Sequence, residues 1–78
     1  MTQITIVHGP KGCGKTRNDK RLAAKYGCDF VSDAEDVTPA ALEQFGAKHA
    51  LLLTYDLDGA KQRFPGARTF IPFASAMA

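Results

Sequence analysis

The sequence has few of the residues that secreted, metal-binding or membrane proteins depend on. Its 78 residues include two cysteines and no tryptophan. Cys13 and Cys28 do not have the spacing of a metal-binding motif, and this cysteine usage indicates a reducing, cytoplasmic compartment. No apolar run approaches the roughly 20 residues of a membrane span, and no signal-peptide pattern opens the chain. We therefore expect no membrane association.

Acidic residues are scarce at both ends of the chain. Residues 1–27 contain Asp19 as their only acid. The bases of the same segment are Lys11, Lys15, Arg17, Lys20, Arg21 and Lys25. A basic first helix is a candidate surface for nucleic acid. No aromatic residue is interleaved among these bases, so we favour a solvated helix face whose field also helps to hold a triphosphate.

The length of the chain predicts one domain, residues 1–78, and limits what that domain can contain. A chain of this size buries only about 60–65% of the surface that its unfolded form exposes. Most nucleotide hydrolases use longer chains to provide a base-recognition pocket, a lid and sensor residues. This chain has little room for all three.

One motif stands out from this ordinary composition. Residues 9–16 read G-x-x-x-x-G-K-T, the pattern of a phosphate-binding P-loop. The β-branched run from Thr2 to Val7 precedes the motif and predicts a buried strand, and a helix-compatible stretch from Thr16 to Tyr26 follows it. Strand, glycine-rich turn and helix are the context in which this pattern binds phosphate.

Each position of the motif has a physical role. Glycines allow the backbone to approach a ligand closely, so the N–H groups of residues 11–16 can surround an anion at the start of the helix. Lys15 is expected to reach the β- and γ-phosphates, and the Thr16 hydroxyl to ligate Mg²⁺. The residues expected to bind the nucleotide are Gly9, Pro10, Lys11, Gly12, Cys13, Gly14, Lys15, Thr16 and Arg17.

The rest of the chain alternates between predicted strands and helices. Short strands are predicted at residues 29–31 and 69–71, and Pro72 places the latter at a sheet edge. Thr38 and Pro39 predict the start of a helix over residues 39–45 that faces inward through Leu42 and Phe45. The apolar run at residues 50–55 predicts a buried strand, and residues 59–66 are expected to form a loop.

This alternation indicates an α/β protein with right-handed crossovers. We predict a small three-layer fold with a mainly parallel sheet of about four strands in the order 2-3-1-4. The glycine-rich loop is then expected at the carboxyl ends of the strands, where open α/β sheets bind ligands.

Asp56 is the second candidate site residue. It follows a predicted buried strand, as a Walker-B aspartate does, and is expected to hold Mg²⁺ through a water molecule opposite Thr16. The alternative is an exposed aspartate that starts the turn Asp56-Leu57-Asp58-Gly59. Many hydrolysing ATPases have a glutamate directly after this aspartate. Here that position is Leu57, and Asp58 is the next acid, which weakens the case for fast hydrolysis.

These residues support a family resemblance. Gly9 to Thr16, with the additional Gly12, resembles the G-x-x-G-x-G-K-T form of P-loop ATPases of the AAA and related groups. The chain as a whole resembles very short P-loop proteins of phage and prophage genomes. This resemblance implies a P-loop NTPase-like fold, nucleoside-triphosphate binding with Mg²⁺, and the host cytoplasm as compartment. The chain has no N-K-x-D segment to read guanine, so ATP is the default nucleotide.

Three functions follow from the sequence. The first is ATP binding with weak or partner-dependent hydrolysis, in which Lys15, Asp56 and Asp58 are the catalytic candidates. Arg63 and Arg68 are its candidate arginine fingers, supplied by a second copy of the chain or by a protein partner, although surface solvation is the simpler role for each. The second is a small phosphotransferase. The third is a non-catalytic module that binds phosphate or nucleic acid.

Overall fold

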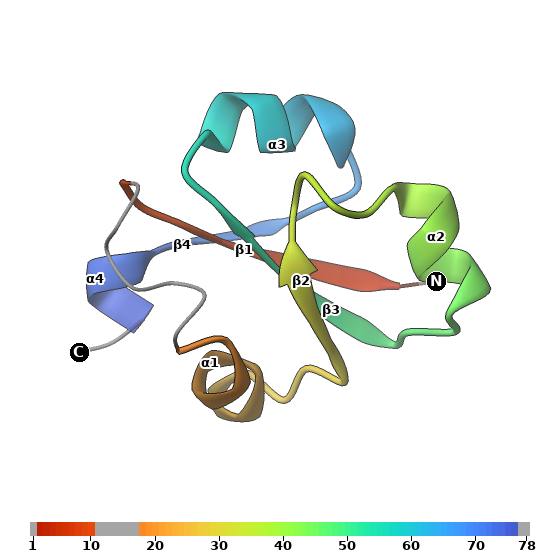
Figure 1. Ribbon diagram of the computed structural model, residues 1–78, viewed down its shortest axis with the longest axis horizontal. Coiled ribbons are helices and arrows are strands. Elements are labelled where there is room, and N and C mark those ends of the chain that lie inside the picture. The colour runs from red at the N-terminus through yellow and green to blue at the C-terminus, as the bar shows by residue number, and fades with distance from the viewer. Residues whose placement is uncertain (1, 11–17, 77–78) are drawn as a thin grey trace.

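The computed structural model describes residues 2–10 and 18–76. Strands and helices alternate along the described chain (Figure 1). In order they are β1 (Gln3–His8), α1 (Asp19–Lys25), β2 (Phe30–Asp33), α2 (Pro39–Gln44), β3 (His49–Thr54), α3 (Leu57–Arg63), β4 (Thr69–Pro72) and α4 (Phe73–Ala76). The predicted α/β alternation is therefore confirmed.

The strands form one sheet in the order β2-β3-β1-β4, and every pair is parallel. The predicted order is confirmed, and β4 with its Pro72 lies at an edge. The two central strands are in register from Gln3 opposite His49 to His8 opposite Thr54. The central strands are covered on both faces, which is why β3 reads as an unbroken apolar run rather than an alternating one.

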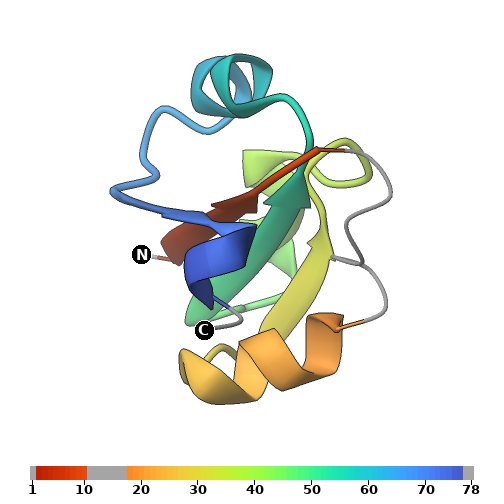
Figure 2. The ribbon, with the colours of Figure 1, turned by 90° about the vertical axis from the view of Figure 1, so that its left-hand side faces the viewer.

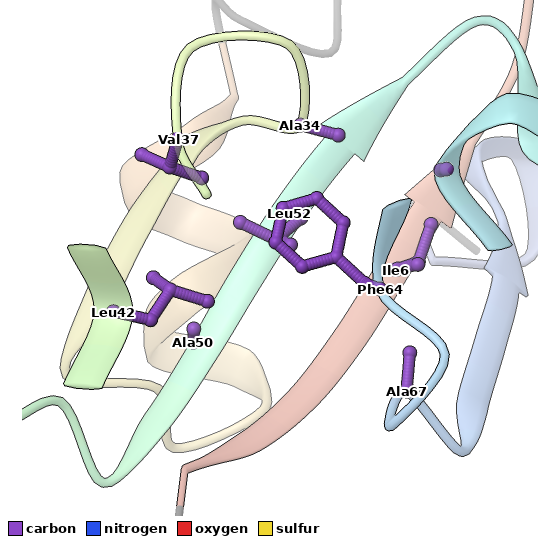
Figure 3. Close-up of a cluster of buried hydrophobic side chains, with 9 residues drawn as sticks. Ile6, Ala34, Val37, Leu42, Ala50, Leu52, Phe64 and Ala67 are labelled. Atoms are coloured by element: carbon purple, nitrogen blue, oxygen red, sulfur yellow. The ribbon is translucent and has the colours of Figure 1, made fainter. Parts of the chain in front are cut away.

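Helices cover both faces of this sheet, so the molecule has three layers (Figures 1 and 2). Successive side chains of a strand point to opposite faces. Ile6 and Leu52 belong to the core under α2 and α3, whereas Val7 and Leu53 belong to the core under α1 and α4. Figure 3 shows the first of these cores, in which Phe64 lies over Leu52 and beside Ile6.

The placement of the helices gives every crossover the same hand. From β1 to β2 the chain moves across β3, with α1 on one face. From β2 to β3, and from β3 to β4, it moves in the opposite direction, with α2 and α3 on the other face. Reversing both the direction and the face leaves the handedness unchanged, as expected for parallel sheets.

The predicted start signal of α2 is present, and a glycine ends the helix. The Thr38 hydroxyl accepts a hydrogen bond from the Ala41 N–H at 3.1 Å, which caps the helix start. Gly46 ends the helix with φ +68°, and the Ala47 N–H bonds back to the Leu42 carbonyl. Gly27 ends α1 in the same way, with φ +67°.

Two expectations for local structure were wrong. Residues 57–63 form α3, although residues 59–66 were expected to form a loop. The Asp56 side chain caps this helix, and the cap compensates for the low helix propensity of Gly59. Phe45 was expected to face inward with Leu42, but it is 66% exposed and stacks on Phe30 at 5.5 Å between ring centroids.

Candidate functional site

At one point in the sheet, the helices that follow two neighbouring strands lie on opposite faces. The strands β2 and β3 are followed by α2 and α3 on one face, and β1 and β4 by α1 and α4 on the other. Because β3 and β1 are neighbours, the chain leaves their carboxyl ends in opposite directions. In open α/β sheets a crevice at such a switch point is where ligands bind.

The first residues of the glycine-rich motif lie at this switch point. Gly9 follows β1, and its N–H donates to the Thr54 carbonyl at the end of β3, at 3.1 Å. Pro10 is exposed. The remaining candidate residues of the motif lie outside the described residues: Lys11, Gly12, Cys13, Gly14, Lys15, Thr16 and Arg17.

Asp56 leaves the neighbouring strand at the same edge of the sheet. It is exposed and is the N-cap of α3, where its Oδ1 accepts from the Gly59 N–H at 3.1 Å. A Cβ atom on Gly59 would collide with this carboxylate, so a larger residue there would require the Asp56 side chain to shift. The local structure thus fits the alternative role of Asp56 considered above, that of an exposed aspartate that starts a turn. Oδ1 is the capping oxygen.

Thr54 is a residue whose role at this edge the sequence reasoning missed. Its hydroxyl accepts from the Asp56 N–H at 2.9 Å and donates to the Asp56 carbonyl at 3.1 Å. Thr54 is buried, and these two bonds fix the backbone that carries the Asp56 carboxylate. The signal was present in the sequence as a threonine directly after the apolar residues 50–53.

A small hollow lies beside Asp56. It has a volume of about 80 Å³ and is lined by residues of β3, α3 and the turn after β2, among them Thr54, Asp56 and Arg63. Since a water molecule takes about 30 Å³ of liquid, this hollow has room for a few waters or a hydrated ion, and not for a nucleotide. Asp58 is exposed in the first turn of α3.

The two candidate arginine fingers lie in different places. Arg63 Nη2 donates to the carbonyls of Glu35 and Val37, at 3.2 Å each, so the guanidinium holds the turn after β2 in its own chain. Arg68 precedes β4 and therefore lies at the amino edge of the sheet, opposite the switch point. Arg68 can reach a site at the carboxyl edge only in a second copy of the chain.

Two kinds of feature are absent from the described ranges, 2–10 and 18–76. These ranges contain no cluster of three or more His, Cys, Asp or Glu side chains that could hold a metal ion. They also contain no helix long and apolar enough to span a membrane. Of the two predicted Mg²⁺ ligands, Asp56 lines the small hollow together with Glu35, and Thr16 is outside the described part.

Comparison with known proteins found no match to this chain among protein-family models, curated proteins or solved structures. A proposal for its function therefore rests on the sequence pattern and on the geometry of the sheet.

Proposed function

We propose that this protein binds a nucleoside triphosphate, with ATP as the default, together with Mg²⁺, through the loop that follows β1. In this proposal the backbone of residues 9–17 and Lys15 hold the phosphates, and Thr16 and Asp56 hold the metal. The fold is then a minimal P-loop NTPase-like fold.

The observation that carries the proposal is the position of Gly9 at the switch point between β1 and β3. The topology selects this point as the ligand crevice without reference to the motif. The motif begins there independently, with Gly9 bonded to the end of β3. Asp56 leaves β3 at the same edge, with Thr54 fixing its backbone. Two lines of reasoning, one from topology and one from residue type, thus select the same edge.

Hydrolysis in this proposal is weak or depends on a partner. The position after Asp56 is Leu57, which cannot polarise a water molecule, and Asp58 is the nearest following acid. Arg63 is engaged with the carbonyls of Glu35 and Val37. An arginine that offsets the charge on the transferring phosphate would therefore come from a protein partner or from a second copy of this chain.

The test is calorimetric titration of the purified protein with ATP and with GTP, each with and without Mg²⁺. Phosphate release is followed in the same samples. We expect Mg²⁺-dependent binding that Lys15→Ala weakens at least about tenfold, since a charge-assisted bond to phosphate contributes about 1.5–3 kcal/mol. Lys20→Ala is the matched control, because Lys20 is an exposed base of α1 outside the motif, and it should change affinity less than about twofold.

The other outcomes select other functions. Turnover that requires a nucleotide or metabolite acceptor would assign a phosphotransferase. Binding of polyanions with a steep salt dependence, without Mg²⁺ and without a Lys15 effect, would assign a non-catalytic anion-binding module. A folded wild-type protein that binds neither ATP nor GTP would refute the proposal.

A further inference from the structure

The sheet face under α1 and α4 changes from apolar to polar along its strands. Near the carboxyl ends this face carries Val7, Leu51, Leu53 and Ile71, which pack in the core. Two residues earlier on each strand, the same face carries Thr5 on β1, His49 on β3 and Thr69 on β4. Thr5 and Thr69 are direct neighbours in the β1–β4 register. His49 lies two residues nearer the amino ends, opposite Gln3, so polar residues of three adjacent strands gather toward this end of the sheet.

A hollow of about 490 Å³ opens at this end of the sheet. Its lining combines these three residues with others at the amino ends of β1 and β4. The further lining residues are Thr2, Gln3, Ile4, Gly66 and Arg68. The hollow is at the opposite edge of the sheet from Gly9 and Asp56, so it is separate from the proposed nucleotide site. Its volume is within the roughly 300–1,000 Å³ range of small-molecule sites.

The polar groups of the hollow are mainly hydrogen-bond donors. Thr5 is 4% exposed, and its Oγ1 lies 2.6 Å from Nε2 of His49. In the imidazolium form both ring nitrogens donate, so Nε2 bonds to Thr5 and Nδ1 remains for a ligand. Arg68 adds a planar guanidinium and Thr69 adds a hydroxyl, whereas the Thr2 hydroxyl donates to the Ala47 carbonyl at 2.8 Å.

No carboxylate lines this hollow among the described residues. The acid nearest to His49 in the hydrogen-bond network is Asp29, and both of its oxygens accept backbone bonds. Oδ2 accepts from the Lys48 N–H and Oδ1 from the His49 N–H, at 3.0 Å each. The described lining therefore contains the positive charge of Arg68 and no negatively charged side chain.

We propose that this hollow binds a small metabolite through an oxyanion, either a phosphate or a carboxylate group. Arg68 holds the oxyanion with paired N–H donors, a geometry that suits both groups. His49 and the Thr69 hydroxyl bond to the remaining oxygens. The hollow is larger than an inorganic anion requires, so it also has room for the rest of a small metabolite.

The experiment is an NMR titration of the full chain at fixed pH and ionic strength, with inorganic phosphate in one arm and acetate in the other. The chain has two histidines, so the ring signals separate the two edges of the sheet. His49 reports on the hollow, and His8, next to Gly9, reports on the nucleotide edge. We expect a saturable shift of the His49 signals. The arm that produces it identifies the oxyanion as phosphate or carboxylate.

Arg68→Gln tests the role of the guanidinium and should weaken the binding seen at His49 about tenfold. Arg68 is exposed, so the variant is expected to fold. Lys20→Gln removes the same charge from α1 and should change that affinity less than about twofold. Shifts of His49 that are linear and equal in both arms would overturn the proposal, and so would an unchanged affinity in Arg68→Gln. A failure of nucleotide binding would leave it standing, because His8 and His49 report separately.

Discussion

At the scale of single residues, Asp56 has two separable tasks. Its Oδ1 caps α3, and its negative charge is proposed to hold Mg²⁺. Asparagine keeps a side-chain acceptor for the cap but removes the charge. We therefore expect Asp56→Asn to change the free energy of unfolding by a few tenths of a kcal/mol, while the gain in nucleotide affinity from Mg²⁺ falls about tenfold or more.

The comparison variant is Asp56→Ala, which removes both tasks. It should lose the Mg²⁺ effect and also destabilise the protein by about 1 kcal/mol, as for other N-cap replacements. Urea unfolding measures stability, and nucleotide titration with and without Mg²⁺ measures the metal effect. If Asp56→Asn retains full Mg²⁺ dependence, the residue is a helix cap alone.

Asp29 makes the stability of the folded protein depend on pH in the acidic range. Backbone N–H donors from Lys48 and then His49 hold the pKa of its carboxyl below the ordinary value of 3.8. The charged form is thus favoured in the folded state, and its contribution to stability is complete above the unfolded pKa. That contribution is lost as pH falls below about 4 and through the folded pKa. Asp29→Asn should therefore flatten the decline of the urea midpoint between pH 5 and about 2.5. Parallel curves for the variant and the wild type would contradict this.

At the scale of elements, side-chain caps help to determine whether the short helices form. The Thr38 hydroxyl bonds to the Ala41 N–H, and α2 has only six residues. Helices of this length do not form alone in water, so the cap and the packing of Leu42 determine whether it forms. Thr38→Ala should lower the free energy of unfolding by about 1 kcal/mol, and Thr38→Ser by much less, because serine keeps the hydroxyl. Equal losses in the two variants would show that the methyl group, and not the cap, is responsible.

The elements also show what sequence patterns can and cannot predict. The β-branched and apolar runs predicted β1 and β3 because both strands are buried on two faces. The pair Thr38-Pro39 predicted the start of α2 because the cap is local. Helix α3 was missed because it contains Gly59, and its stability comes from Asp56 before it and from Phe64 packing after it. Phe45 was misplaced because its ring stacks on Phe30 of β2, a contact between residues distant in the sequence.

At the scale of the whole molecule, the predicted strand order is confirmed, although right-handed crossovers alone also allow other orders, such as 2-1-3-4. One consequence could also be predicted, namely that the glycine-rich motif begins at the carboxyl edge. The hollow around His49 and Arg68 could not be predicted, since its residues are far apart in the sequence and become neighbours only in the β3-β1-β4 register. The Asp29 and Arg63 contacts to distant backbone groups were unpredictable for the same reason.

The stability of the whole molecule should depend strongly on the centre of β3. A domain of this size is typically stable by about 0.05–0.15 kcal/mol per residue, so a single core residue contributes a large share. Leu52 is fully buried and packs with Ile6 and Phe64 under α2 and α3 (Figure 3). Leu52→Ala should cost about 2–5 kcal/mol, because the sheet and both helices close over the cavity and cannot collapse into it.

Phe45→Ala is the control for this prediction, since it also replaces a large apolar side chain by a small one. Phe45 is 66% exposed and contacts Phe30 by stacking, so we expect a cost of about 1 kcal/mol or less. Urea unfolding followed by circular dichroism measures both variants, and nucleotide titration of folded Phe45→Ala should match the wild type. If the two substitutions cost the same, β3 is not at the centre of a closed core, and the three-layer arrangement that holds Gly9 beside Thr54 would be wrong.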